Sequence, residues 1–181
     1  NKYAQHFSLT LSANIAIEQS YGYIDGDSAS LAELCALISA ITSLPISQSI
    51  ALTGSINQHG DVQAIGGVNE KIEGFFKLCK MRGLTGEQGV IIPKSNQVNL
   101  VLDDEILNAV ELGKFNIFAV ETVDQALNLL MDIDAGDMID EQYPVDSVNG
   151  IALARLKDIA DIVNGDNSDD KDDSEDEKGE L

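Results

Sequence analysis

Residues 66–93, GGVNEKIEGFFKLCKMRGLTGEQGVIIP, decide the fold of this chain. The stretch opens with two glycines that break the preceding segment. Apolar residues then recur at helical spacing as far as Gly83: Val68, Ile72, Phe75, Phe76 and Cys79. Residues 89–93 are wholly apolar, which is typical of a short strand buried on both faces of a parallel sheet. The stretch therefore predicts a helix followed by a central strand.

The same alternation of elements continues toward the C-terminus. Helical spacing predicts a further helix over residues 98–112, and residues 115–120 (FNIFAV) predict another strand. Thr122 is the expected N-cap of a short helix that runs through Leu130. Helices and strands in this β-α-β-α order imply parallel strands joined by right-handed crossovers.

Segments before residue 66 predict an antiparallel addition to this sheet. Residues 49–56 (SIALTGSI) and 61–65 (DVQAI) have the length and composition of a β-hairpin. Residues 31–44 have helical spacing, and Pro45 ends that helix. Residues 7–17 alternate apolar and small polar side chains, as an extended strand does. We therefore expect an α/β (α+β) fold with a mixed sheet, built from a β-hairpin and β-α-β-α units.

The chain is strongly acidic. Its 181 residues include 31 acidic and 11 basic ones, for a formal net charge of −20. Phosphate binding needs clusters of lysine and arginine, so we expect neither nucleic acid nor membrane as a partner. No apolar run is long enough for a membrane span, and the N-terminus lacks a signal pattern. We expect a cytoplasmic protein in which the two distant cysteines, Cys35 and Cys79, are buried free thiols.

Composition divides the chain into three parts. Residues 1–132 hold the predicted sheet and its helices and form the expected folded domain. Residues 133–163 are expected to be an acidic linker followed by a C-terminal helix that begins at Ile151. Residues 164–181 are low in complexity and rich in acids, so we expect a disordered acidic tail. Such a tail also admits a role as an interaction segment for basic partners.

The sequence DGDSAS, residues 25–30, admits two interpretations. In the structural one, Ser30 and Glu33 form a capping box, or Asp27 or Ser28 caps the following helix. In the catalytic one, Ser28 is a nucleophile at a helix N-terminus. A nucleophilic serine requires a base, which another part of the chain has to supply.

Lys71 is the strongest candidate for that base. His6 lies near the N-terminus and His59 in the predicted hairpin turn, and both are expected to be solvated surface residues. Lys71 lies in the first turns of the second helix, where the positive end of the helix dipole and partial burial both disfavour its charged form. A neutral amine there can take a proton from a hydroxyl. The alternative is a surface lysine paired with a neighbouring acid: Glu70, Glu73 or Glu33.

Thr53 adds a polar side chain to the apolar strand over residues 49–56. By strand alternation it shares a face with Ala51 and Ser55. Its hydroxyl can orient a buried lysine, although threonine is also simply a favourable strand residue. The residues alone therefore indicate a candidate set of Ser28, Lys71 and Thr53.

These motifs resemble those of a known family. DGDSAS, followed by TGSI, GDVQAIGGVNEKIEG and GVIIPKSN, is similar in order and spacing to the proteolytic domain of the Lon proteases. More narrowly, it resembles the B-type branch, with its bacterial Lon-related proteins, over residues 13–132. The resemblance implies Ser28 as nucleophile, Lys71 as general base and Thr53 as the residue that hydrogen-bonds the lysine. Asp25 matches the acid three residues before the serine, which in some family members lies against the dyad and restricts access to it.

The resemblance also implies an activity for the intact protein. It is that of an ATP-dependent serine endopeptidase that cleaves unfolded or damaged proteins inside a hexameric ring. The chain contains no G-x-x-x-x-G-K-[ST] loop, so ATP and Mg²⁺ are expected only for an ATPase module outside it, and no cofactor or metal is expected within it. Only 27 residues precede Ser28, which implies a domain that is incomplete at its N-terminus. The alternative is a catalytically silent Lon-like scaffold or oligomerisation module.

Overall fold

The structure is a computed structural model that describes residues 2–3, 7–9, 11–16 and 26–172, with side chains as far as residue 165. The chain forms two compact units. The larger one spans residues 17–135, and the smaller one combines residues 1–16 with residues 136–181. The larger unit holds the sheet and every candidate site residue that the structure describes.

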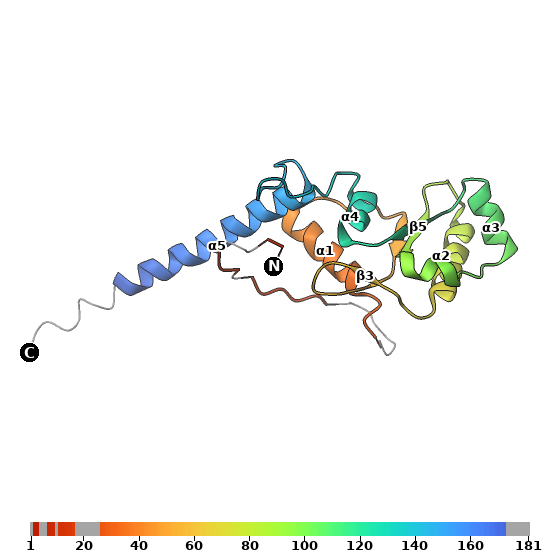
Figure 1. Ribbon diagram of the computed structural model, residues 1–181, viewed down its shortest axis with the longest axis horizontal. Helices are drawn as coiled ribbons and strands as arrows, with labels where there is room; N and C mark the ends of the chain where they lie inside the picture. The colour runs from red at the N-terminus through yellow and green to blue at the C-terminus, as the bar shows by residue number, and fades with distance from the viewer. Residues whose placement is uncertain (1, 4–6, 10, 17–25, 173–181) are drawn as a thin grey trace, which may run out of the picture. The chain divides into compact units, whose positions relative to one another are not determined.

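A parallel sheet of three strands lies at the centre of the larger unit (Figure 1). β4 (Gly89–Pro93) is the middle strand, with β1 (Ile50–Leu52) on one side and β5 (Asn116–Val120) on the other. Both pairings are parallel, which confirms the predicted order of parallel strands. All five residues of β4 are buried, as its unbroken apolar sequence predicts.

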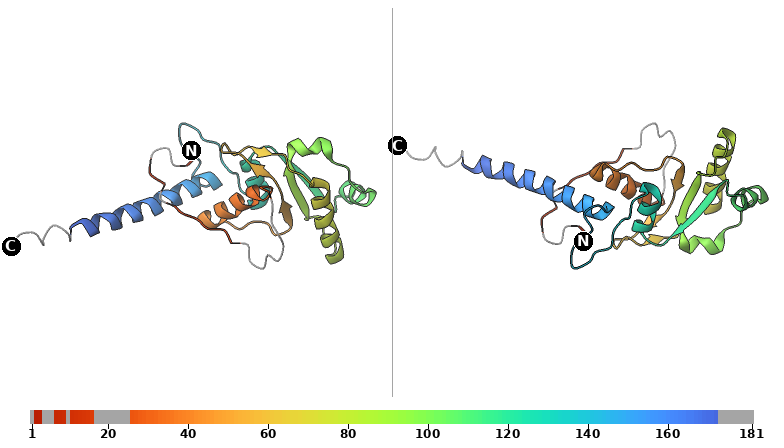
Figure 2. Two further views of the ribbon diagram at one scale, coloured as in Figure 1. Left: turned by 90° about the horizontal axis from the view of Figure 1, so that it is seen from below. Right: turned by 90° about the horizontal axis from the view of Figure 1, so that it is seen from above.

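Helices cover both faces of this sheet (Figure 2). α2 (Val68–Arg82) and α3 (Asp104–Glu111) lie on one face, and α1 (Ser30–Thr42) and α4 (Val123–Met131) lie on the other. Together with an antiparallel hairpin, this arrangement gives the α/β class with parallel and antiparallel strands that the sequence predicts.

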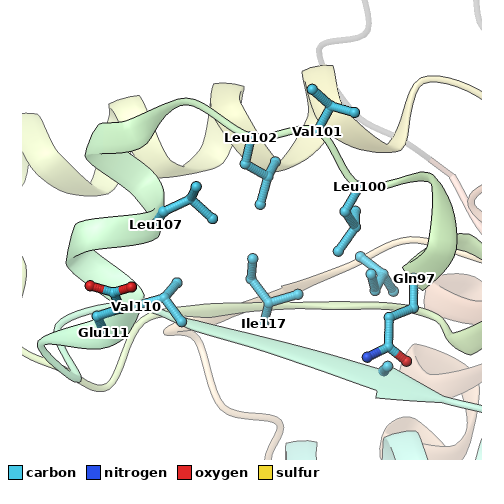
Figure 3. A pocket seen from close by; sticks show the side chains of 10 residues that line it. Gln97, Leu100, Val101, Leu102, Leu107, Val110, Glu111 and Ile117 are labelled. Carbon is cyan, nitrogen blue, oxygen red and sulfur yellow. The ribbon is translucent and has the colours of Figure 1, made fainter.

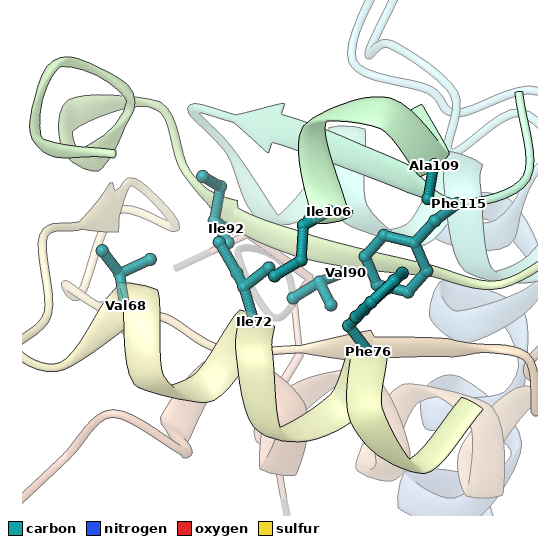
Figure 4. Close-up of a cluster of buried hydrophobic side chains, with 8 residues drawn as sticks. All are labelled: Val68, Ile72, Phe76, Val90, Ile92, Ile106, Ala109 and Phe115. Atoms are coloured by element: carbon teal, nitrogen blue, oxygen red, sulfur yellow. The ribbon is translucent and has the colours of Figure 1, made fainter. Parts of the chain in front are cut away.

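An apolar core fills the space between the sheet, α2 and α3 (Figure 4). The buried side chains that form it are Val68, Ile72, Phe76, Val90, Ile92, Ile106, Ala109 and Phe115. The rings of Phe76 and Phe115 meet edge to face, with centroids 5.2 Å apart and planes at 82°. The α2 members are four residues apart, so a single stripe of this helix faces the sheet, as the sequence spacing predicts.

The predicted strand over residues 49–56 is wrong as a single element. It is two strands: β1, which belongs to the parallel sheet, and β2 (Ser55–Ile56), which pairs antiparallel with β3 (Val62–Gln63). The predicted hairpin is therefore confirmed, but of residues 49–56 only the last two, Ser55 and Ile56, belong to it. The change of partner occurs at Gly54.

Gly54 is where the chain leaves the parallel sheet. Its N–H donates to the Ser28 carbonyl at 2.9 Å, and its carbonyl accepts from the Leu31 N–H at 3.1 Å. An added Cβ would lie 3.0 Å from Leu31 Cδ2 and 3.1 Å from Val62 Cγ1, so a side chain there would push against both. The N–H and carbonyl of Gly54 therefore bond to the start of α1 instead of to a neighbouring strand of the sheet.

Two further expected elements differ from the structure. Residues 98–112 form no continuous helix, because a short 3₁₀ helix, η1 (Lys94–Asn99), ends in extended backbone at Leu100 and α3 begins only at Asp104. The extended connection packs Leu100 and Leu102 against the core. Residues 7–9 and 11–16 form no strand, since no described strand edge pairs with them.

The helix ends follow local rules. The Thr122 cap is confirmed, because its Oγ1 accepts from the Gln125 N–H at 3.3 Å at the start of α4. Ser43 ends α1 in left-handed backbone with φ 59°, two residues before Pro45. The predicted end of that helix at residue 44 is therefore off by two residues.

Both cysteines are buried free thiols, as predicted. Burial raises the pKa of the Cys35 thiol to about 12. Burial also raises the pKa of the Cys79 thiol, although the Arg82 guanidinium acts in the opposite direction. Both thiols are protonated at neutral pH, so neither is a candidate nucleophile.

The smaller unit contains one long helix, α5 (Val148–Asp172). Tyr3 Oη donates to Asn149 Oδ1 at 2.7 Å, which ties the N-terminal segment to the first turn of α5. The predicted terminal helix is confirmed, but it continues past Asn164, where the sequence predicts a disordered tail. Once the first turns of a helix are fixed, each further residue adds a hydrogen bond at small cost. The rest of the predicted tail, residues 173–181, lies outside the described residues.

Candidate active site

The three candidate residues meet where three elements begin or end. Ser28 lies two residues before α1, Thr53 directly follows β1, and Lys71 lies in the first turn of α2. Lys71 Nζ donates to Ser28 Oγ at 2.7 Å and to Thr53 Oγ1 at 3.3 Å. The carboxyl end of a parallel strand and the N-termini of two helices thus converge on one serine hydroxyl.

Thr53 fixes the direction of these hydrogen bonds. The residue is buried, and its Oγ1 donates its single proton to the Ser28 carbonyl at 3.1 Å. Toward Lys71 it can therefore only accept. One buried hydroxyl holds both the backbone of the serine and the amine of the lysine.

The capping interpretation of Ser28 is wrong. The N-cap of α1 is Ala29, and no side chain makes a capping hydrogen bond there. Ser30 Oγ accepts from the Ile56 N–H at 3.1 Å, so it holds β2 rather than the first turn of its own helix. Ser28 Oγ is left to Lys71, which is the arrangement that a nucleophile and its base require.

Lys71 is exposed, which corrects the expected partial burial. The first turn of α2 follows Gly67, which is in left-handed backbone with φ 67°, and its Val68 is buried while Lys71 is exposed. The alternative of a lysine paired with a neighbouring acid is also wrong among the described residues, because no described carboxylate lies within 4.0 Å of Lys71 Nζ. Glu73 pairs instead with Lys77 at 3.6 Å.

Three other residues were named from the sequence: His59, His6 and Asp25. His59 is exposed in the hairpin turn, with its ring beside the Gln58 amide, as predicted. His6 and Asp25 lie outside the described residues, so the placement of Asp25 against the dyad stays a prediction. Within the described ranges, no group of three His, Cys, Asp or Glu residues is arranged to hold a metal ion.

A pocket of about 260 Å³ opens beside the Ser28 hydroxyl. Besides the three candidate residues, its lining is small and apolar: Ala29, Ala32, Ala51, Leu52 and Val90. Small side chains leave the space in front of Ser28 Oγ free, so an extended ligand can bring one apolar side chain into it.

A larger cavity, of about 580 Å³, lies elsewhere in the same unit, between α3, β5 and the connection that follows η1 (Figure 3). Its lining is apolar apart from Gln97 and Glu111. Its lining contains no pair of a nucleophile and a base, so this cavity could bind a ligand but has no residues to catalyse a reaction. The reactive geometry of the described chain is therefore at Ser28.

One contact beside the site has no counterpart among the residues singled out from the sequence. Ser55 Oγ donates to Asp27 Oδ2, so the residue before Ser28 is tied to β2. Strand alternation places Ser55 on the same face as Thr53, and that was the available signal.

Comparisons with known proteins find a family model and relatives that match most of this chain. The family model described as the Lon protease (S16) C-terminal proteolytic domain matches residues 10–132. A protein of Escherichia coli (strain K12) named "Putative Lon protease homolog" is 57% identical over 125 residues, which are 69% of this chain and 21% of the relative.

Two further relatives carry related names. A protein of the same name from Haemophilus influenzae is 54% identical over 133 residues, or 74% of this chain and 22% of the relative. An archaeal Lon protease of Methanocaldococcus jannaschii is 39% identical over 120 residues, or 66% of this chain and 16% of that protein. The chain thus spans about a fifth of the length of the curated relatives it matches.

Proposed function

The chain belongs to the Lon protease family, and on that basis we propose that it is a serine endopeptidase domain with Ser28 as nucleophile and Lys71 as general base. The observation that carries the proposal is the 2.7 Å hydrogen bond between Lys71 Nζ and Ser28 Oγ. A lysine and a serine at that distance, with a hydroxyl that orients the lysine, form one of the known pairings of nucleophile and base.

In the first half of the reaction the enzyme is acylated. Neutral Lys71 takes the Ser28 proton while Oγ forms a bond to the peptide carbonyl carbon. Backbone N–H groups around Ser28, at the positive end of α1, stabilise the oxygen that becomes negative. The lysine, now an ammonium, gives its proton to the leaving amine as the C–N bond breaks.

In the second half the acyl group leaves the enzyme. Lys71, again neutral, takes a proton from a water molecule whose oxygen attacks the ester carbon. The ester bond to Ser28 Oγ then breaks, and the same proton returns to the serine. The cycle consumes one water for each peptide bond and uses no group from outside the chain.

Substrate binding supplies the desolvation that the free site lacks. Lys71 is exposed in the described chain, so its amine is open to water. A peptide that fills the 260 Å³ pocket excludes water from the same side of Lys71 as Ser28. Water exclusion and the N-terminus of α2 then both favour the neutral amine.

For the intact protein we propose the wider activity of the family. The substrates are unfolded or damaged proteins in the cytoplasm, the assembly is a hexameric ring, and cleavage is coupled to an ATPase module that uses ATP and Mg²⁺. The 133 matched residues are 22% of one relative, which leaves room for such a module in a protein of that length. Asp25 is proposed to lie against the dyad and to limit access to it.

Thr53→Val is expected to lower kcat/KM for a peptide substrate by about 10- to 100-fold, because it removes the acceptor that orients Lys71. Thr53→Ser keeps the hydroxyl and is expected to keep most of the rate. Steady-state hydrolysis of a fluorogenic peptide measures both. A valine variant as active as wild type would show that Lys71 needs no such support.

Cleavage of casein by the wild-type protein and by Ser28→Ala tests the proposal. We expect fragments from the wild type and none from Ser28→Ala. Ser95→Ala, an exposed serine in η1, serves as the matched control and should cleave like wild type. Equal cleavage by Ser28→Ala would contradict the assignment of the nucleophile. No cleavage by a folded wild-type protein would favour the silent scaffold.

A further inference from the structure

The carboxylate of Asp27, the residue before Ser28, is hydrogen-bonded to a side chain of β2. Ser55 Oγ donates to Asp27 Oδ2. Ser55 is 4% exposed and stands in β2, whose register against β3 is fixed by the pairs Ser55–Gln63 and Ile56–Val62. A buried hydroxyl needs a hydrogen-bond partner, and the Ser55 hydroxyl finds it in the carboxylate of Asp27, which is itself exposed.

The position of that carboxylate matters for Lys71. A carboxylate within about 4–6 Å of an amine favours its charged form, and a charged lysine cannot take a proton from serine. Asp27 is the described carboxylate nearest in sequence to the nucleophile. Yet no described carboxylate lies within 4.0 Å of Lys71 Nζ.

The other described acids on the two helices that begin beside Ser28 and carry Lys71 are the following. On α2 these are Glu70, whose carboxylate turns back toward Gly67, and Glu73, which is paired with Lys77. On α1 the acid is Glu33, in the first turn. β1 and β2 contribute uncharged residues only. Among these acids, Asp27 is the one whose carboxylate is held by the hydroxyl of Ser55.

We propose that Ser55 is a positioning residue that holds the Asp27 carboxylate off Lys71, so that the lysine can become neutral. The inference rests on the proposed dyad, since it concerns the base in that mechanism. Without the Ser55 hydroxyl the carboxylate loses this partner and turns toward the ammonium of Lys71. The result is an ion pair between Asp27 and Lys71 in place of the bond between Lys71 and Ser28.

The test is the pH dependence of phosphonylation by a fluorophosphonate, which reports serine reactivity without a full turnover. Ser55→Ala is expected to move the acidic limb of the rate upward by about one pH unit, so that the rate at pH 7 falls about 10-fold and recovers at high pH. Ser55→Thr keeps the donor and should match wild type. Ser55→Ala with Asp27→Asn, which removes the charge, should return the limb to its wild-type position.

A structural role for Ser55 alone gives a different pattern. It predicts a loss of rate at every pH that Asp27→Asn does not restore, and that pattern would overturn the proposal. A wild type that is not phosphonylated speaks against the proposed function, and a crystal structure of Ser55→Ala then decides the inference. An Asp27 oxygen within 4 Å of Lys71 Nζ supports it, and an Asp27 carboxylate that stays at β2 contradicts it.

Discussion

Lys71→Met is expected to lower kcat/KM for a peptide substrate by about 10⁴-fold, the scale of loss when a nucleophile is deprived of its base. Methionine has nearly the length of lysine and is tolerated on a helix surface. The 2.7 Å bond to Ser28 Oγ is lost, and the serine stays a weakly nucleophilic alcohol. Hydrolysis of a fluorogenic peptide at neutral pH measures the effect.

Lys77→Met is the matched control for that substitution. Lys77 lies on the same helix, is exposed and pairs only with Glu73 at the surface, so the rate should be unchanged. Circular dichroism should show both variants folded. A Lys71→Met protein that keeps more than about a tenth of the wild-type rate would contradict its role as base.

Phe115→Ala is expected to lower the free energy of unfolding of the larger unit by about 3–5 kcal/mol. Phe115 is fully buried, and its ring meets Phe76 edge to face and lies 6.3 Å from the Phe75 ring. Deleting the ring leaves a cavity between α2, α3 and the sheet. Such a loss is a large part of the stability of an ordinary domain.

Urea unfolding followed by circular dichroism measures this change. Leu112→Ala is the control, since Leu112 is 60% exposed and its truncation should change the free energy of unfolding by less than about 0.5 kcal/mol. Similar destabilisation by both variants would mean that Phe115 does not anchor the core described here.

The elements that the sequence predicts best are those whose pattern and burial agree. Gly89–Pro93 is apolar throughout and is buried throughout, and α2 places the expected stripe on the sheet. Thr122 caps its helix because only its own next turn is involved. In each of these cases the neighbouring residues in the sequence are sufficient to predict the observed element.

The errors arise where a distant segment decides the outcome. Residues 49–56 are uniformly strand-like in sequence. Gly54 nevertheless leaves the sheet, because its backbone N–H and carbonyl bond to Ser28 and Leu31 at the start of α1. The extended backbone from Leu100 toward α3 is chosen by packing against the core rather than by helical spacing. Residues 11–16 alternate as a strand does but have no partner edge among the described residues.

In the candidate site too, the residues were predicted from local motifs, whereas their surroundings depend on distant segments. Motif spacing singled out Ser28, Thr53 and Lys71, and the fold brings all three within hydrogen-bond distance. The exposure of Lys71 did not follow from its place one residue before buried Ile72, because a helix turns neighbouring side chains 100° apart. Strand alternation placed Ser55 on the face of Thr53, but its bond to Asp27 depends on how two segments distant in sequence pack together.

Mapping the site of phosphonylation tests the central claim most directly. The wild-type protein and Lys71→Met are incubated with a fluorophosphonate, and the modified residue is located by peptide mass spectrometry. We expect a single adduct on Ser28 in the wild type, formed with loss of fluoride, and almost none in Lys71→Met. An adduct on another residue, or equal labelling of Ser28 in both proteins, would contradict a dyad of Ser28 and Lys71.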